Sequence, residues 1–420
     1  MKKILAVGMT LVCVMLCGCD NSPTSEQFPQ EFAVSSFTEK ELHADVNFLV
    51  NVLERNHKWL YSKVYWAEYE WDMEFLKEDI TAGLNDIQFY YEICRLLAKI
   101  GDGKTKPIAG LSEDVQYKIP FTVMRLTEGY YIESIDKEHE EYLGWCLAAI
   151  DGVEVKKLKS KLSEYIPYHN EVSLWRNLGE NLNDYWLLFC AGIVEDTEVE
   201  LTLSKDGETV SITLEACSAS AFKDVDVVAL EVPQENMKQD VYYYLERQED
   251  ILYFQYNIAD TDPEYPMRVL LEDLEKDLYE CRAFVIDLRY NDGLTGRGGN
   301  LPIINDVLVG YVENGGKVYC LIGNGTGGTV VDRALKYRRD LGATLVGEST
   351  IDSRIYFNEL GEFALPYSGI TFQYPTKRTV LLGTSIDDEL EPDVAVVHTI
   401  EDYLAGIDRD METVRELLNN

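Results

Sequence analysis

The residues AFVIDLRYNDG, 283–293, join an apolar run to a polar end that contains glycine, which is the pattern of a buried strand entering a loop. From residue 241 onward similar strand-like runs alternate with helical patterns. The other runs are DILYFQYNIA (250–259), KVYCLIG (317–323), ATLVGE (343–348), GITFQYP (369–375) and DVAVV (393–397). This alternation predicts an α/β core over residues 236–420, with a largely parallel sheet whose strands carry site loops at their carboxyl ends.

Two further regions precede this core. Residues 37–112 repeat apolar positions at intervals of three and four, which predicts a helical region. Residues 113–235 consist mostly of short β-like runs with a helical insert at about 172–191. The stretch LGWCLAAIDGVEVKKL, 143–158, resembles the centre of a PDZ-like module, which takes a peptide as an added strand. A small β spacer is the alternative.

The N-terminus has the pattern of an export signal. Residues 1–19 contain two lysines, an apolar run and a Leu-x-Gly-Cys ending that resembles a bacterial lipobox. Acylation of Cys19 is therefore expected, with residues 20–36 as a flexible linker and the protein anchored in the cell envelope, on the extracytoplasmic face of a bacterial membrane. An ordinary cleaved signal peptide or a retained anchor are the alternatives.

Charge and residue spacing argue against nucleic-acid binding and against a metal site. The formal net charge of −36 would repel nucleic acid, so none is expected as a partner. The histidines show no spacing typical of metal ligands, so no metal site is predicted; they are His43, His57, His139, His169 and His398. Isolated cysteines in mostly apolar runs suggest small buried side chains, with their disulfide state left open; they are Cys94, Cys146, Cys190, Cys217, Cys281 and Cys320.

The residues GNGTGG, 323–328, satisfy the spacing of a dinucleotide-binding loop. A strand-like run precedes them, a helical pattern follows, and Glu348 ends the next run at the position of a ribose ligand. The dinucleotide interpretation is nevertheless remote, because export removes a protein from cytoplasmic nicotinamide cofactors. No cofactor is expected.

The order of several motifs resembles the C-terminal processing, or tail-specific, serine peptidases, including their tricorn-like branch. The motifs are FVIDLRYNDG (284–293), VGEST (346–350), LPYSGITF (365–372) and EPDVAV (391–396), with KIGDGKT (99–105) and IDGVEV (150–155) before them and EDYLAGIDRD (401–410) after them. The resemblance covers nearly all of the chain beyond the signal. It implies an α/β sandwich core of the ClpP/crotonase-like type with a PDZ-like module.

The same resemblance places four functional positions on residues that depart from the family pattern. The nucleophile position falls on Gly328, which has no side chain. The base position of the lysine-using branch falls on Ser353, and that of the histidine-using branch on Lys104. The oxyanion turn includes Gly293, but Leu294 stands where the family has a second glycine.

The sequence therefore predicts a catalytically impaired member that binds a peptide or an unfolded protein segment. An active but atypical peptidase is the alternative, with Thr326 or Thr329 as nucleophile and Lys104 as base. Peptide preference and oligomeric state stay open.

Overall fold

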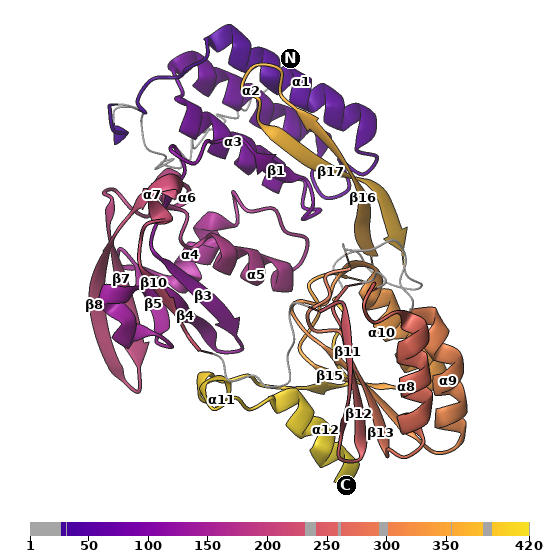
Figure 1. The fold of residues 1–420 in the computed structure, drawn as a ribbon. Helices are drawn as coiled ribbons and strands as arrows, with labels where there is room; N and C mark the ends of the chain where they lie inside the picture. The colour runs from indigo at the N-terminus through magenta and orange to yellow at the C-terminus, as the bar shows by residue number, and fades with distance from the viewer. Residues whose placement is uncertain are drawn as a thin grey trace, which may run out of the picture.

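The computed structural model describes residues 27–30, 32–231, 241–258, 262–293, 301–353, 355–380 and 389–419. The chain forms three parts, which are a helical layer, a β module and an α/β core (Figure 1). Cys19 and Leu294 lie outside the described residues. No helix among these residues combines the length and apolar character needed to cross a membrane.

The helical layer contains α1 (Glu39–Asn56), α2 (Trp66–Ala82) and α3 (Asp86–Ala98). Thr38 begins α1 with a capping box, in which its side chain and that of Glu41 each accept a backbone N–H. The helical spacing of Leu42, Val46, Leu49 and Leu53 then puts all four on one buried face.

A hairpin from the α/β part of the sequence completes this layer. Its strands are β16 (Ile355–Ala364) and β17 (Thr371–Val380), and β17 also pairs with β1 (Lys106–Ala109). GITFQYP therefore lies in a separate antiparallel sheet rather than in the parallel sheet where the sequence placed it. The reason is packing, because Leu365, Ile370 and Phe372 are buried against the three helices.

The β module is a sheet with helices packed on it. Strand order in the main sheet is β10-β4-β5-β7-β8, with β3 on β4 and β6 on β5, and β2 pairs with β9 in a separate two-stranded sheet. The strands are β2 (Tyr117–Lys118), β3 (Phe121–Leu126), β4 (Gly129–Asp136), β5 (Cys146–Ile150), β6 (Val153–Glu154), β7 (Glu198–Lys205), β8 (Glu208–Glu215), β9 (Cys217–Ser218) and β10 (Val227–Ala229). The helices are η2 (Lys137–Tyr142), α4 (Val155–Leu162), α5 (Glu171–Asn181), α6 (Tyr185–Cys190) and α7 (Ala219–Phe222).

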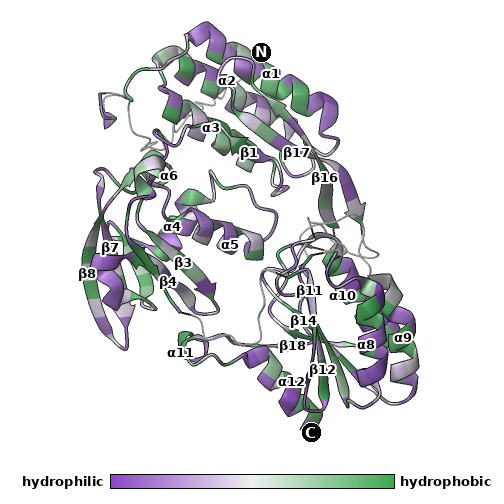
Figure 2. Cartoon of the chain, in the orientation of Figure 1, coloured by the Kyte–Doolittle hydropathy of each residue, from purple (hydrophilic) through white to green (hydrophobic). Residues whose placement is uncertain are grey.

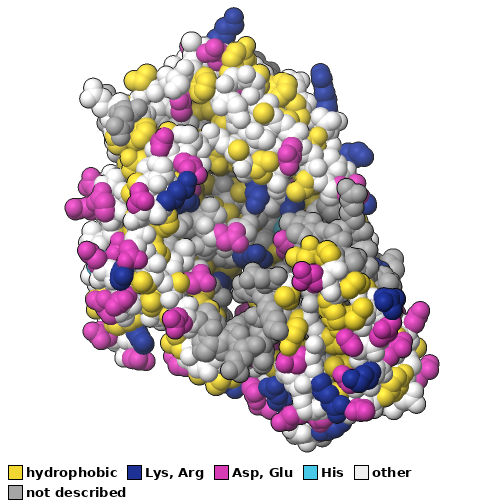
Figure 3. Space-filling view, viewed as in Figure 1, with side chains coloured by type: hydrophobic (Ala, Val, Ile, Leu, Met, Phe, Trp, Pro, Cys, Tyr) yellow, Lys and Arg dark blue, Asp and Glu magenta, His cyan; other side chains and the backbone are white. Residues whose placement is uncertain are grey.

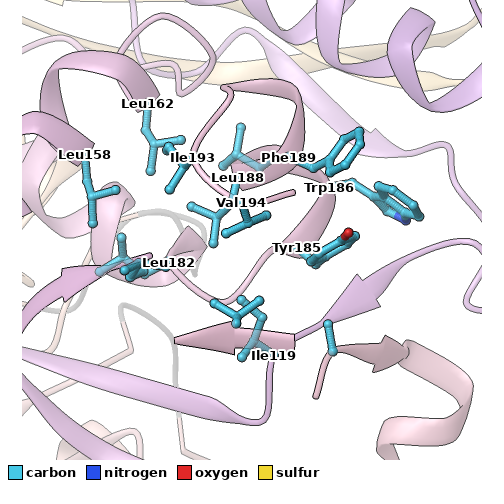
Figure 4. Packing of buried hydrophobic residues seen from close by; sticks show 14 of the residues in the cluster. Ile119, Leu158, Leu162, Leu182, Tyr185, Trp186, Leu188, Phe189, Ile193 and Val194 are labelled. Carbon is cyan, nitrogen blue, oxygen red and sulfur yellow. The ribbon is translucent and has the colours of Figure 1, made fainter. Parts of the chain in front are cut away.

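Trp186 on α6 is fully buried among aromatic and aliphatic side chains of the module (Figure 4). Its ring contacts Phe28, whose ring centroid lies 5.5 Å away, and its indole N–H donates to the carbonyl of Val115. Phe28 was expected in the flexible linker, but this stacking buries it in the module core. The predicted helical insert is present as α5 and α6.

The α/β core has the strand order β11-β12-β13-β14-β15-β18. All pairs are parallel except β11 with β12, which confirms the predicted parallel sheet. The strands are β11 (Tyr243–Gln248), β12 (Ile251–Tyr256), β13 (Ala283–Asp287), β14 (Lys317–Ile322), β15 (Thr344–Gly347) and β18 (Val394–Ala395). The helices are α8 (Met267–Leu278), α9 (Leu301–Glu313), α10 (Gly328–Leu341), α11 (Ile400–Leu404) and α12 (Arg409–Asn419).

The two faces of this sheet bury different helices. Side chains of α8, α9 and α10 pack on one face with Phe284 and Ile286, whereas α12 packs on the other face with Val285. Alternation along a strand directs neighbouring side chains to opposite faces, which explains why β13 is apolar at every position before its terminal Asp287. Figure 2 shows green, hydrophobic strands between helices that also carry purple, hydrophilic residues.

Candidate functional site

The loops at the carboxyl ends of β13 and β14 meet at the edge of the core sheet. The first follows Asp287 and ends the stretch FVIDLRYNDG, and the second is GNGTGG. They are joined by a hydrogen bond of 3.0 Å from the N–H of Gly327 to the carbonyl of Asn291. The expected nucleophile position and the expected oxyanion turn therefore lie side by side.

Gly328 begins α10 in the left-handed region, with φ +52°. A Cβ atom at this position would lie 3.0 Å from the carbonyl oxygen of Asp292 and 3.1 Å from that of Gly293. Gly293 is more crowded, because a Cβ atom there would lie 2.4 Å from the carbonyl oxygen of Gly327. Glycine thus permits the close approach of the two loops.

Asp352 occupies the N-terminus of α10. Its Oδ2 atom accepts the backbone N–H of Gly328 over 2.6 Å, and its side chain is 1% exposed. A helix N-terminus attracts negative charge, so the carboxylate fills the place where an anionic group of a ligand would bind. Asp352 directly precedes the candidate base position at Ser353, but no motif or spacing in the sequence marks it as a site residue.

Two cationic or ionisable side chains from other parts of the molecule approach this carboxylate. Lys104 Nζ lies 3.7 Å from Asp352 Oδ2, and His169 Nε2 lies 3.3 Å from Asp352 Oδ1. Burial lowers the pKa of His169, Asp352 opposes this shift, and the positive charge of Lys104 adds to it. His169 precedes α5, so the helical layer, the β module and the core all contribute to the cluster.

Lys104 is held by a buried turn. The carboxylate of Asp102 accepts the N–H groups of Lys104 and Thr105 through Oδ1, each over 2.7 Å. Its Oδ2 atom accepts from His57 Nε2 over 2.6 Å, while His57 Nδ1 accepts the N–H of Trp59. Although burial opposes it, the hydrogen bonds from His57 and Thr105 lower the pKa of Asp102. His57, like His169, could not be assigned from sequence spacing.

The other candidate hydroxyls have different surroundings. Thr326 is fully buried; its hydroxyl donates to the carbonyl of Leu288 over 2.9 Å and accepts the N–H of Gly323 over 3.0 Å. Ser353 is also fully buried, and its hydroxyl donates to the carbonyl of Ile355. Thr329 is exposed on the first turn of α10. The hydroxyls of Thr326 and Ser353 are thus engaged with backbone groups.

Glu348, the ribose-ligand position of the dinucleotide interpretation, belongs to a polar network. It accepts hydrogen bonds from Thr127 and from Asn324 Nδ2, both at 3.3 Å, and lies 3.5 Å from His398 Nδ1. The Asp352 carboxylate already accepts the N–H of Gly328, which a phosphate at the helix N-terminus would need.

A cavity of about 570 Å³ connects these loops to the β module. Val123 and Arg125 of β3 line one side, Arg176 of α5 another, and Asp292 and Asn324 the core side. A neighbouring cavity of about 510 Å³ shares Arg125 and Asn324 with it. Figure 3 shows the molecular face hollowed between the three parts, with Lys or Arg side chains in its wall.

No protein-family model matches the sequence, and no curated protein matches it. Solved structures do match. CPAF complexed with lactacystin has 12% sequence identity and a TM-score of 0.63, covering 91% of this chain and 98% of that chain. Mature CPAF has 14% identity and a TM-score of 0.62 with the same coverage. The photosystem II D1 C-terminal processing protease also matches, with 13% identity, a TM-score of 0.42, and coverage of 90% and 97%.

The chain has a tail-specific peptidase-like fold, as the resemblance implied. At these identities the likeness concerns the fold alone. The α/β class predicted from the alternating runs is confirmed.

Proposed function

We propose that this protein binds a segment of peptide or unfolded protein in the cleft between its three parts and does not hydrolyse it. The observation that carries the proposal is Gly328, which supplies no hydroxyl and whose N–H is bonded to Asp352. A serine peptidase needs a nucleophile, a base and free donors for the oxyanion. Here the nucleophile is absent, and a carboxylate repels a second negative charge at the same place.

The cavity supports the binding half of the proposal, because β3 offers an unpaired edge. Among the described strands β3 pairs only with β4, and a two-residue turn joins Leu126 to Gly129. The closing pair of such a turn is hydrogen-bonded, so the alternating ladder directs the N–H and C=O groups of Val123 and Arg125 away from β4. Both residues line the cavity. An extended peptide could therefore pair with them as an added strand.

The same proposal includes export and acylation at Cys19, on the strength of the signal-like residues 1–19. Metabolic labelling of the expressing bacterium with a fatty-acid analogue tests this part. We expect label on the wild-type protein and none on the Cys19→Ala variant. Label on both proteins would contradict acylation at this residue.

The central experiment combines a cleavage assay with a binding assay. Purified protein is incubated with an unstructured polypeptide and, separately, with a serine-reactive phosphonate, while fluorescence anisotropy reports binding of labelled peptides. We expect binding without cleavage or labelling. The active alternative predicts cleavage that Thr329→Ala and Lys104→Ala each reduce by orders of magnitude. Thr326→Ala tests the other candidate nucleophile in the same assay.

A further inference from the structure

The cleft contains a cation that has no carboxylate partner among the described residues, although the chain as a whole has a net charge of −36. Arg125 lines both cavities. Across the described part of the chain, no carboxylate oxygen lies within 4.0 Å of its guanidinium nitrogens. Arg176, in contrast, pairs with Glu180 at 3.0 Å, and Arg289 pairs with the carboxylates of Asp287, Asp408 and Asp410.

Aromatic rings hold the Arg125 side chain in place. Its guanidinium carbon lies 5.4 Å from the ring centre of Trp175 and 5.8 Å from that of Tyr130. One of its terminal nitrogens lies 3.4 Å from the carbonyl of Gly129, a long hydrogen bond that leaves most of its donors available. A side chain fixed by stacking loses less entropy when it binds a ligand.

The position of Arg125 on β3 links this cation to the unpaired strand edge. Its backbone groups point toward the position of an added strand, and its side chain shares a face with that of Val123. A peptide paired with β3 would place alternate side chains on that same face, directly opposite Arg125. A carboxylate there could accept two parallel hydrogen bonds from the guanidinium.

We propose that Arg125 recognises an aspartate or glutamate side chain of the bound segment, so that the cleft selects acidic peptides. This inference rests on the peptide-binding function proposed above and adds the chemistry of its ligand. The strong negative charge of the protein, which includes Glu180 and Asp292 in the cavity wall, disfavours acidic peptides. A preference for them therefore points to a local site such as Arg125.

The test uses pairs of fluorescent nonapeptides from a randomised library in which the central residue is glutamate or glutamine. Affinity is measured by anisotropy for the full mature protein. We expect the glutamate set to bind about tenfold more tightly than the glutamine set, as for a hydrogen bond to a charged group. Arg125→Gln is expected to remove this preference and Arg125→Lys to retain part of it, because lysine keeps the charge without the planar fork.

Arg268→Gln is the matched control. It removes one positive charge from an exposed i,i+4 pair with Glu272 on α8, outside both cavities. Its glutamate preference should equal that of the wild type. Thermal melts of all variants establish that they are folded. If Arg125→Gln does not fold, the preference of the wild type for glutamate peptides is instead compared at low salt and at 1 M salt. Salt screens charges, so an ionic preference should be smaller at 1 M.

The outcomes separate the two proposals. Equal affinity for both peptide sets, or a preference that persists in folded Arg125→Gln, overturns the role of Arg125 and leaves peptide binding intact. A preference in the wild type that high salt does not reduce also overturns it. If neither set binds, the proposed function itself fails.

Discussion

The backbone N–H of Gly328 donates to the carboxylate of Asp352, which is buried beneath Lys104 and His169. The N–H group at the first residue of α10 therefore already has an acceptor within the chain and is not free to bind a reacting group. The carboxylate also joins three parts of the molecule, because Lys104 and His169 come from the helical layer and the β module. It therefore contributes to stability as well as to the proposed loss of catalysis.

Replacement of Asp352 by alanine should destabilise the protein. It leaves the Gly328 N–H without its acceptor and Lys104 without its carboxylate, and breaking a buried charge pair costs about 3 kcal/mol. Urea unfolding measures the free-energy difference. Asp352→Asn is the control, since an amide oxygen can still accept the Gly328 N–H, and its loss should be smaller. Equal losses in both variants would show that the charge, rather than the hydrogen bond, dominates.

His169 offers a direct probe of the charges around the cluster. Burial lowers its pKa, Asp352 raises it, and Lys104 lowers it. We therefore expect its titration midpoint, followed by NMR of the imidazole, to lie below 6.5 in the wild type. The midpoint should fall further in Asp352→Asn and rise in Lys104→Met. Shifts in the opposite directions would contradict the arrangement.

Thr326 should behave as a structural residue. Its buried hydroxyl bridges the carbonyl of Leu288 and the N–H of Gly323. Thr326→Val therefore leaves the Gly323 N–H without its acceptor, while the Leu288 carbonyl keeps only the N–H of Asn291. A loss of about 1–3 kcal/mol is expected in urea unfolding. Thr326→Ser retains the hydroxyl and should lose much less. Unchanged stability of the valine variant would argue against these bonds.

The parallel sheet could be predicted from the sequence, because alternating strand-like and helical runs indicate it directly. The assignment of Gly328, Gly293 and Lys104 to catalytic positions depends on motif order and stays a prediction. Asp352 and His169 could not be predicted in this way. Their relation arises only when segments about 180 residues apart fold against each other, and neither belongs to a recognisable spacing.

Local sequence patterns also could not specify which strands pair or which side chains pack together. An alternating or apolar run predicts a strand but not the sheet that it joins, and β17 accordingly pairs with β1 and β16. Phe28 shows the same limit, since a polar neighbourhood suggested a linker while the aromatic ring packs on Trp186.

The contribution of His398 to the free energy of unfolding should decrease as the pH becomes alkaline. Burial opposes its charge, but hydrogen bonds to Asp410 and Glu348 raise its pKa to about 10 from an ordinary value of 6.5. Because the folded pKa is the higher one, the ionic contribution is complete below 6.5, decreases between 6.5 and about 10, and is lost above that range. The stability difference between the wild type and His398→Gln should therefore shrink from pH 6 to pH 10. A constant difference would contradict this assignment.

Gly328→Ser tests whether the missing hydroxyl alone accounts for the proposed inactivity. A side chain here must adopt φ +52° and approach the carbonyl oxygens of Asp292 and Gly293 to about 3 Å, so we expect a loss of about 1–3 kcal/mol. Gly342→Ser at the other end of α10 is the matched control, since its φ is +63° but no atom lies within 4 Å of its Cβ position. Both variants carry backbone strain, so the difference between their losses of unfolding free energy measures the cost of crowding at residue 328. Because Asp352 still holds the helix N-terminus, the serine at 328 should not react with a phosphonate. Labelling that Lys104→Met abolishes would instead mean that a working base survives beside Gly328, and that one substitution removed the activity.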